Sequence, residues 1–143
     1  MNPIVTLIDF SDLAPKLLEQ SERFGKALGS RGVLLHVVPN DPIAIDAGIG
    51  ATNVTQPPSE ASVQQEYNRL SAMGDLLNKA GVNVTVDQLV GADMRTVLDE
   101  CERLNPELII VGSHHHGALY NWFMGSFTSD VLKAVNFPVL VVP

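Results

Sequence analysis

The chain has 143 residues, of which 45% are hydrophobic and 17% charged, and its formal net charge is −7. This composition is typical of a globular protein and excludes a largely disordered one, and the length predicts one domain over residues 1–143. No apolar stretch is long enough to cross a membrane, and the acidic balance disfavours nucleic-acid binding because phosphate backbones are repelled.

Apolar runs and helical periodicity alternate along the whole chain. In chain order the pattern predicts a strand at 5–8, a helix at 11–28, a strand at 33–38, a helix at 59–80, a strand at 82–90, a helix at 93–104, a strand at 108–111, a helix at 125–134 and a strand at 138–142.

The boundaries of these elements carry local signals. We expect Ser11 or Asp12 to cap the first helix, and Gly29 with Gly32 to end it. Residues 40–58 contain several Pro and Gly, and we expect a long loop there, which in a compact domain is usually functional or mobile.

The alternation predicts the fold class. Strands that alternate with helices favour an α/β architecture with one doubly wound, mainly parallel five-stranded sheet and helices on both faces, that is, a Rossmann-like fold. The strands at 5–8, 33–38, 108–111 and 138–142 are almost continuously apolar, as expected for strands buried on both faces.

In such sheets a ligand binds beyond the carboxyl ends of the strands, where the strand order reverses. Asp9, Val37 and Gly112 follow or end strands there, and Gly125-Ser126 begins the last predicted helix, whose N–H groups suit phosphate. A structural reading stays open for each: Asp9 would cap the following helix with Ser11, and the glycines would only form turns.

Other motifs give weaker evidence about function. Neither G-x4-G-K-[ST] nor a dinucleotide fingerprint is present. His114-His115-His116 suggests a metal, but three consecutive side chains cannot all face one ion, so we expect no metal site. His36 is expected to be a packed, hydrogen-bonded residue. Cys101, the single cysteine, can form no internal disulfide, and with no basic signal segment at the N-terminus we expect a cytoplasmic protein.

Taken together, five segments resemble the universal stress protein family. They are Leu7-Ile8-Asp9-Phe10-Ser11, Leu34-Leu35-His36-Val37-Val38, Leu108-Ile109-Ile110-Val111-Gly112-Ser113-His114, Gly125-Ser126 and Pro138-Val139-Leu140-Val141-Val142-Pro143. Gly112, Gly125 and Ser126 match the signature G-x2-G-x9-G-[ST] of its nucleotide-binding branch. His115 replaces the second glycine, where an imidazole could narrow the phosphate site or hydrogen-bond a phosphate.

The resemblance implies a fold similar to the adenine nucleotide alpha hydrolases, with ATP or AMP as ligand, with or without Mg²⁺. It implies that Asp9 contacts the ribose region, that the Val37 backbone meets adenine, and that the last strand pairs with its copy in a homodimer. The nucleotide-binding residues that it implies are Ile8, Asp9, Val37, Gly112, His114, His115, Gly125, Ser126, Phe127 and Thr128.

Three functions are compatible with these residues. The one that we favour is an adenine-nucleotide-binding regulatory or sensor domain that acts as a dimer in the stress response. The alternative is a dimeric interaction module of the same fold that binds no nucleotide. An enzyme ranks lowest, at most a slow ATPase, because the sequence provides no general base and no catalytic residue can be named.

Overall fold

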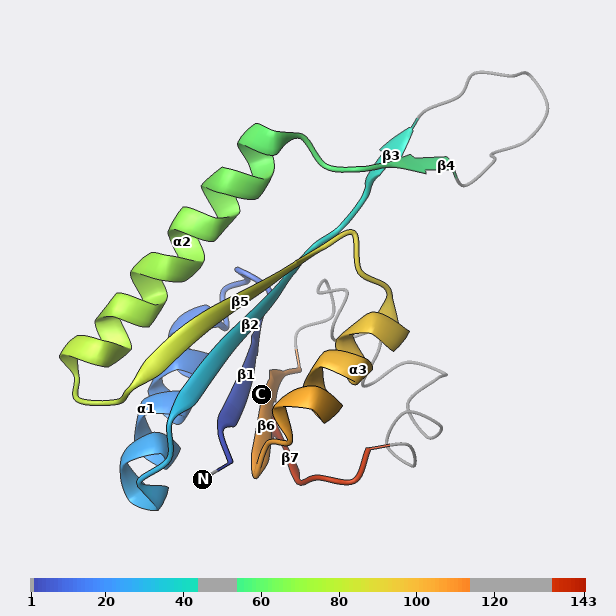
Figure 1. Ribbon diagram of the computed structural model, residues 1–143. Helices are drawn as coiled ribbons and strands as arrows, with labels where there is room; N and C mark the ends of the chain where they lie inside the picture. Colours follow the sequence, from blue (N-terminus) through green and yellow to red (C-terminus); the bar gives the residue numbers. More distant parts are fainter. Residues whose placement is uncertain (1, 44–53, 114–134) are drawn as a thin grey trace.

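The computed structural model describes residues 2–43, 54–113 and 135–143 (Figure 1). Its elements in chain order are β1 (Ile4–Ile8), α1 (Ala14–Leu28), β2 (Gly32–Val38), β3 (Asp41–Ile43), β4 (Val54–Gln56), α2 (Glu60–Lys79), β5 (Val84–Val90), α3 (Met94–Leu104), β6 (Leu108–Gly112) and β7 (Val139–Val142). Among the described residues, no helix has both the length and the apolar character needed to span a bilayer.

Five strands form one sheet in the order β5-β2-β1-β6-β7, and every neighbouring pair is parallel. The chain therefore starts in the middle of the sheet, builds outward to β5, and then returns past β1 to build the other half. This is the doubly wound arrangement that the alternating pattern predicts. The expected fold class is confirmed.

Helices cover both faces of the sheet. The side chains of β1 alternate between two cores: Val5 and Leu7 face α3, whereas Ile4 and Ile8 face α1 and α2. Figure 1 shows α1 and α2 together on one side of the strands and α3 on the other. β1 and β2 are buried along their whole lengths, because they lie inside the sheet with helices on both faces.

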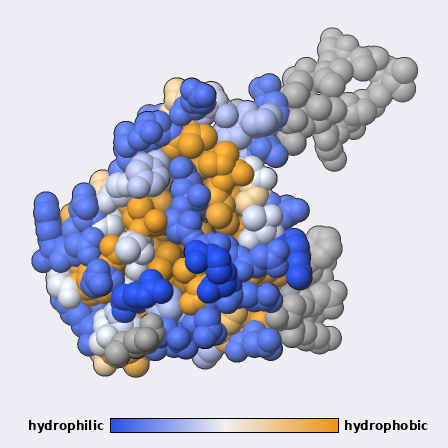
Figure 2. Space-filling model, viewed as in Figure 1, coloured by the Kyte–Doolittle hydropathy of each residue, from blue (hydrophilic) through white to orange (hydrophobic). Residues whose placement is uncertain are grey.

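The outer strands differ from this expectation. β7 was expected to be buried on both faces, but its Val141 is 37% exposed, because β7 forms an edge of the sheet. β5 forms the opposite edge, and its last residue, Val90, is also exposed. Figure 2 shows apolar side chains gathered between α2 and this edge strand.

Two of the expected boundaries were wrong. The N-cap of α1 is Leu13, without a side-chain cap, and Ser11 lies two residues earlier, where its Oγ accepts the N–H of Leu13 at 3.2 Å. Gly29 ends α1 with a φ of 64°, as expected, but Gly32 is already the first residue of β2. A Cβ on Gly32 would lie 3.0 Å from Val84 Cγ2, so close strand packing explains this glycine.

The segment 40–58 is not simply a loop. Its two ends pair as the antiparallel strands β3 and β4, and Figure 1 shows this hairpin beyond the end of β2, away from the five-stranded sheet. Pro42 lies within β3, and a proline is tolerated in a strand that has an open edge. The pairing was missed because the prolines and glycines of this segment favour a loop.

The second half of α2 fixes the helix to the sheet by close packing. Leu70, Gly74 and Leu77 are buried against the strands. A Cβ on Gly74 would lie 2.9 Å from Val86 Cγ1, so glycine allows helix and strand to approach closely. Asn78 then pairs with both backbone groups of Val84: its Nδ2 donates to the carbonyl at 3.1 Å, and its Oδ1 accepts the N–H at 2.9 Å.

Candidate functional site at the carboxyl edge of the sheet

The strand order reverses at β1, which has β2 on one side and β6 on the other. Thr6 pairs with Ile110, and two residues further along each strand the chain reaches Ile8 and Gly112. The crevice outside this point is where open α/β sheets bind ligands. The structure therefore brings Ile8, Asp9 and Gly112 together at the expected edge.

Asp9 follows β1 directly and has a structural role. Its Oδ1 accepts the N–H of Ser11 at 3.0 Å, which fixes the turn that leads to α1. This contact supports the structural alternative to the extent that Asp9 and Ser11 act together before the helix. No donor among the described residues contacts Oδ2 of Asp9, so one carboxylate oxygen remains for a ligand at this edge.

Phe10 adopts an unusual backbone conformation beside Asp9. Its φ is +56°, which is rare for a bulky residue and costs about 1–3 kcal/mol. The ring contacts two side chains: the centroid of the His36 ring lies 4.2 Å away, and the Arg69 guanidinium lies 4.3 Å from the centroid of the Phe10 ring. Such strain persists only where the surroundings fix it, and it is often found at functional sites.

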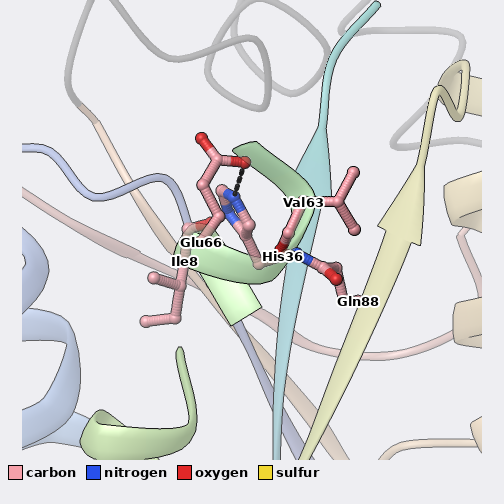
Figure 3. A network of polar contacts seen from close by, with 5 residues as sticks. All are labelled: Ile8, His36, Val63, Glu66 and Gln88. Atoms are coloured by element: carbon pink, nitrogen blue, oxygen red, sulfur yellow. Dashed lines mark hydrogen bonds and ion pairs between the residues drawn. The ribbon is translucent and has the colours of Figure 1, made fainter. Parts of the chain in front are cut away.

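His36, from β2, connects this loop to α2 (Figure 3). Its Nδ1 lies 2.6 Å from the carbonyl oxygen of Ile8, and its Nε2 lies 3.4 Å from Oε2 of Glu66. His36 is only 4% exposed, and the expectation of a packed, hydrogen-bonded histidine is confirmed. Beside it, Gln88 of β5 donates to the carbonyl of Val63 in α2 at 3.1 Å.

Val37 lies where β2 extends past β1. The two strands pair as far as His36, which is opposite Ile8. The carbonyl of Val38 accepts the N–H of Gly91, on the β5 side, at 2.7 Å. Because the backbone groups of a strand alternate in direction, those of Val37 face the β1 side, beyond the last paired residue of β1. This is a suitable position for recognition of a ligand by backbone groups.

Gly112 is a glycine for a reason that the sequence did not indicate. Gly112 does not have a positive φ, so its backbone conformation does not require a glycine. A Cβ at this position would lie 3.2 Å from Leu13 Cδ1 and 3.7 Å from Leu17 Cδ1. The end of β6 thus passes close to the beginning of α1, and this contact accounts for the glycine without a ligand.

Six of the predicted site residues lie outside the described residues: His114, His115, Gly125, Ser126, Phe127 and Thr128. The helix expected at 125–134 and the histidine run at 114–116 lie there too. Among the residues that the structure describes, no three potential metal-ligating side chains gather around one point.

A surface hollow of about 670 Å³ lies at the other end of the sheet. It is lined by Gly25, Lys26, Gly29, Ser30, Arg31, Gly81, Val82 and Asn83. Here α1 and α2 end, and their last carbonyl groups carry the negative end of the helix dipole, which disfavours phosphate. Despite its volume, this hollow is a poorer candidate for an anionic ligand than the carboxyl edge.

Sequence reasoning missed Phe10, Glu66 and Arg69 as members of the site. One signal was present: Glu66 lies four residues before the buried Leu70, on the same helix face, which is an unusual place for a carboxylate. The conformation of Phe10 left no signal, because positive φ is not expected of phenylalanine.

Comparison with known proteins gives a consistent result. The sequence model described as "Universal stress protein family" matches residues 1–143. A universal stress protein of Methanocaldococcus jannaschii is 26% identical over 145 residues, which cover 94% of this chain and 90% of that protein.

Two solved structures are similar in fold. The universal stress protein of Archaeoglobus fulgidus in complex with dAMP matches with a TM-score of 0.68 and 20% identity, covering 100% of this chain and 98% of that one. A universal stress protein in complex with cAMP matches with a TM-score of 0.67 and 15% identity, covering 99% of this chain and 95% of that one.

Proposed function

The chain belongs to the universal stress protein family, and we propose that it binds an adenine nucleotide, ATP or AMP, at the carboxyl edge of β1, β2 and β6. The observation that carries this proposal is the placement of Asp9, Val37 and Gly112 around the point where the strand order reverses. That proteins of similar fold have structures in complex with dAMP and cAMP supports an adenine nucleotide as the ligand.

The residues present suit such a ligand. Oδ2 of Asp9, which no donor among the described residues contacts, can accept a hydrogen bond from a ribose hydroxyl, and the backbone of Val37 can recognise the edge of adenine. The proposed ligands of the phosphates are Gly125, Ser126, Phe127 and Thr128, together with His114 and His115. Mg²⁺ would need only Asp9 and the phosphates, since it often keeps several waters and takes one or two protein carboxylates.

The biological role follows from the same reading. We propose a regulatory or sensor domain in the cytoplasm that acts in the stress response as a homodimer. β7 is the edge that would pair with its copy: it is apolar, it lies at one end of the sheet, and Val141 is exposed. An edge strand of this kind is stabilised when another strand covers it. The net charge of −7 favours a small nucleotide over a nucleic acid.

Thermal unfolding with and without nucleotide tests the proposal. ATP or AMP at 100 times its dissociation constant should stabilise the protein by about 2.7 kcal/mol. Asp9→Ala should remove this stabilisation, whereas Asp12→Ala, which removes an exposed carboxylate from the same loop, should leave it intact. If no adenine nucleotide shifts the unfolding of the wild-type protein, the interaction module without a ligand replaces the sensor.

A further inference from the structure

The protonation of His36 is partly fixed by its neighbours. A carbonyl oxygen can only accept a hydrogen bond, so the 2.6 Å contact with Ile8 requires a hydrogen on Nδ1. The remaining question is whether Nε2 also carries one. A second proton on this imidazole would therefore be on Nε2, which faces Glu66 (Figure 3).

The two states of Nε2 have opposite effects on Glu66. With a proton, Nε2 forms an ion pair with the carboxylate, whose side chain is 31% exposed. Without it, a lone pair faces a carboxylate oxygen at 3.4 Å, and the two acceptors repel each other. Protonation therefore attracts the first half of α2 to β2, and deprotonation releases it.

The same imidazole also holds the loop that carries Asp9. Ile8, whose carbonyl it binds, is the residue before Asp9, and Phe10, whose ring it contacts, is the residue after. Arg69 of α2 also contacts the ring of Phe10. A shift of Glu66 or Arg69 relative to the sheet is thus transmitted to both neighbours of Asp9.

The charged groups around His36 come from two elements in the described part of the chain. α2 places Glu66 against His36 and Arg69 against Phe10, and Asp9 follows Ile8 in the loop after β1. β5 presents the neutral amide of Gln88, which is engaged with Val63. We propose that His36 is a positioning residue through which protons strengthen nucleotide binding at Asp9, a regulation that rests on the proposed function.

The experiment measures the affinity of cAMP by calorimetry between pH 5.5 and pH 8. This probe is suitable because its phosphodiester keeps one charge over the range, whereas phosphate monoesters titrate near pH 6. We expect wild-type affinity to be about two- to fivefold higher at the acidic end, the effect of one partly exposed ion pair.

Two variants and one control test whether the contact between His36 and Glu66 causes the pH dependence of the affinity. Glu66→Gln should give an affinity that does not change with pH, because a neutral amide can donate to bare Nε2. His36→Asn should do the same, with a donor still available to Ile8. Glu60→Gln, which removes an exposed carboxylate at the start of the same helix, should retain the wild-type pH dependence. Equal pH profiles for wild type and Glu66→Gln would overturn the proposal.

A second measurement does not need a nucleotide. In NMR spectra, the amide resonances of Phe10 and Ser11 should titrate together with the His36 ring, and they should stop doing so in Glu66→Gln. If neither ATP, AMP nor cAMP binds at any pH while these amides follow the ring, the proposed function fails and the link through His36 stands. If the amides do not follow the ring, the positioning role is wrong, whatever the binding result.

Discussion

The two halves of α2 contact the sheet in different ways. From Leu70 onward, the helix packs apolar side chains and Gly74 directly onto β5 and its neighbours. Before Leu70, its contacts are polar: Glu66 faces His36, the carbonyl of Val63 accepts from Gln88, and Arg69 lies over Phe10. One half lies over the core, and the other lies beside the candidate site.

The close-packed half of α2 therefore contributes mainly to stability, whereas the contacts of the polar half can change with pH. Close-packed apolar surface is stabilising and responds little to pH, since no proton is exchanged when it forms. Contacts between ionisable side chains contribute less free energy, but they can be switched by a proton. The helix thus combines an attachment that holds the fold with one that can vary next to the ligand edge.

The largest expected effect lies in the close-packed half. Leu77 is 3% exposed, and Leu77→Ala should lower the free energy of unfolding by about 3 kcal/mol, because it removes buried methyl groups and leaves a cavity. The neighbouring Leu76 is 61% exposed, so Leu76→Ala should cost less than about 0.5 kcal/mol. Urea unfolding at pH 5.5 and pH 8 should give the same difference between the two variants, and a strongly pH-dependent difference would show that ionisable groups also act in the close-packed half.

Gly74 tests the same half by adding volume. In Gly74→Val the new side chain would meet Val86, whose Cγ1 lies 2.9 Å from the position of a Cβ. We expect a loss of about 2 kcal/mol from overpacking, measured by urea unfolding. Ala72→Val, on the exposed side of the same turn, should cost only about 0.5 kcal/mol in helix propensity. Equal losses would mean that propensity, and not the contact with β5, sets the cost.

The close-packed parts of the molecule were also the predictable ones. Apolar runs such as that of β1 identify strands that are buried on both faces, and the alternation with helices determines a parallel sheet. Once that sheet is inferred, the rule for ligands at the carboxyl edge selects Asp9, Val37 and Gly112 without coordinates.

The polar contacts could not be predicted in the same way. His36 and Glu66 are 30 residues apart, and their approach depends on the placement of α2 across the sheet. The positive φ of Phe10 is imposed by its neighbours and opposed by its own preference. The reason for a glycine at position 112 could not be predicted either, because the contact with Leu13 joins segments that are distant in the chain.

The opposite face of β5 carries a pair of interacting carboxyl groups, Asp87 and Glu100. There burial, followed by a hydrogen bond to Glu100 and by the negative charge of Glu100, raises the pKa of Asp87 from 3.8 to about 6, although the charge of Arg103 acts in the opposite direction. Oδ2 of Asp87 is buried and has no donor among the described residues. The hydrogen bonds from Arg103, followed by that from Asp87, lower the pKa of Glu100 to about 2. The two carboxyl groups thus share one proton near pH 5.

The smallest expected effect follows from this pair. Because the folded state holds the proton of Asp87 more tightly than the unfolded state, stability falls as the pH rises from about 4 to about 6. Asparagine cannot ionise, and its amide can still donate to Glu100. Asp87→Asn should therefore match the wild type near pH 4 and exceed it by about 1 kcal/mol above pH 7, less than the full pKa shift implies, because solvent screens this partly exposed pair.

Unfolding curves from pH 4 to pH 8 measure this difference. Asp75→Asn, which removes an exposed carboxylate from α2, should change stability by less than about 0.5 kcal/mol throughout. A destabilised Asp87→Asn protein above pH 7 would show that the ionised carboxylate is favourable, contrary to its buried, donor-free oxygen. With the expected result, the ionisation of Asp87 on β5, and not the close-packed half of α2, accounts for the loss of stability as the pH rises.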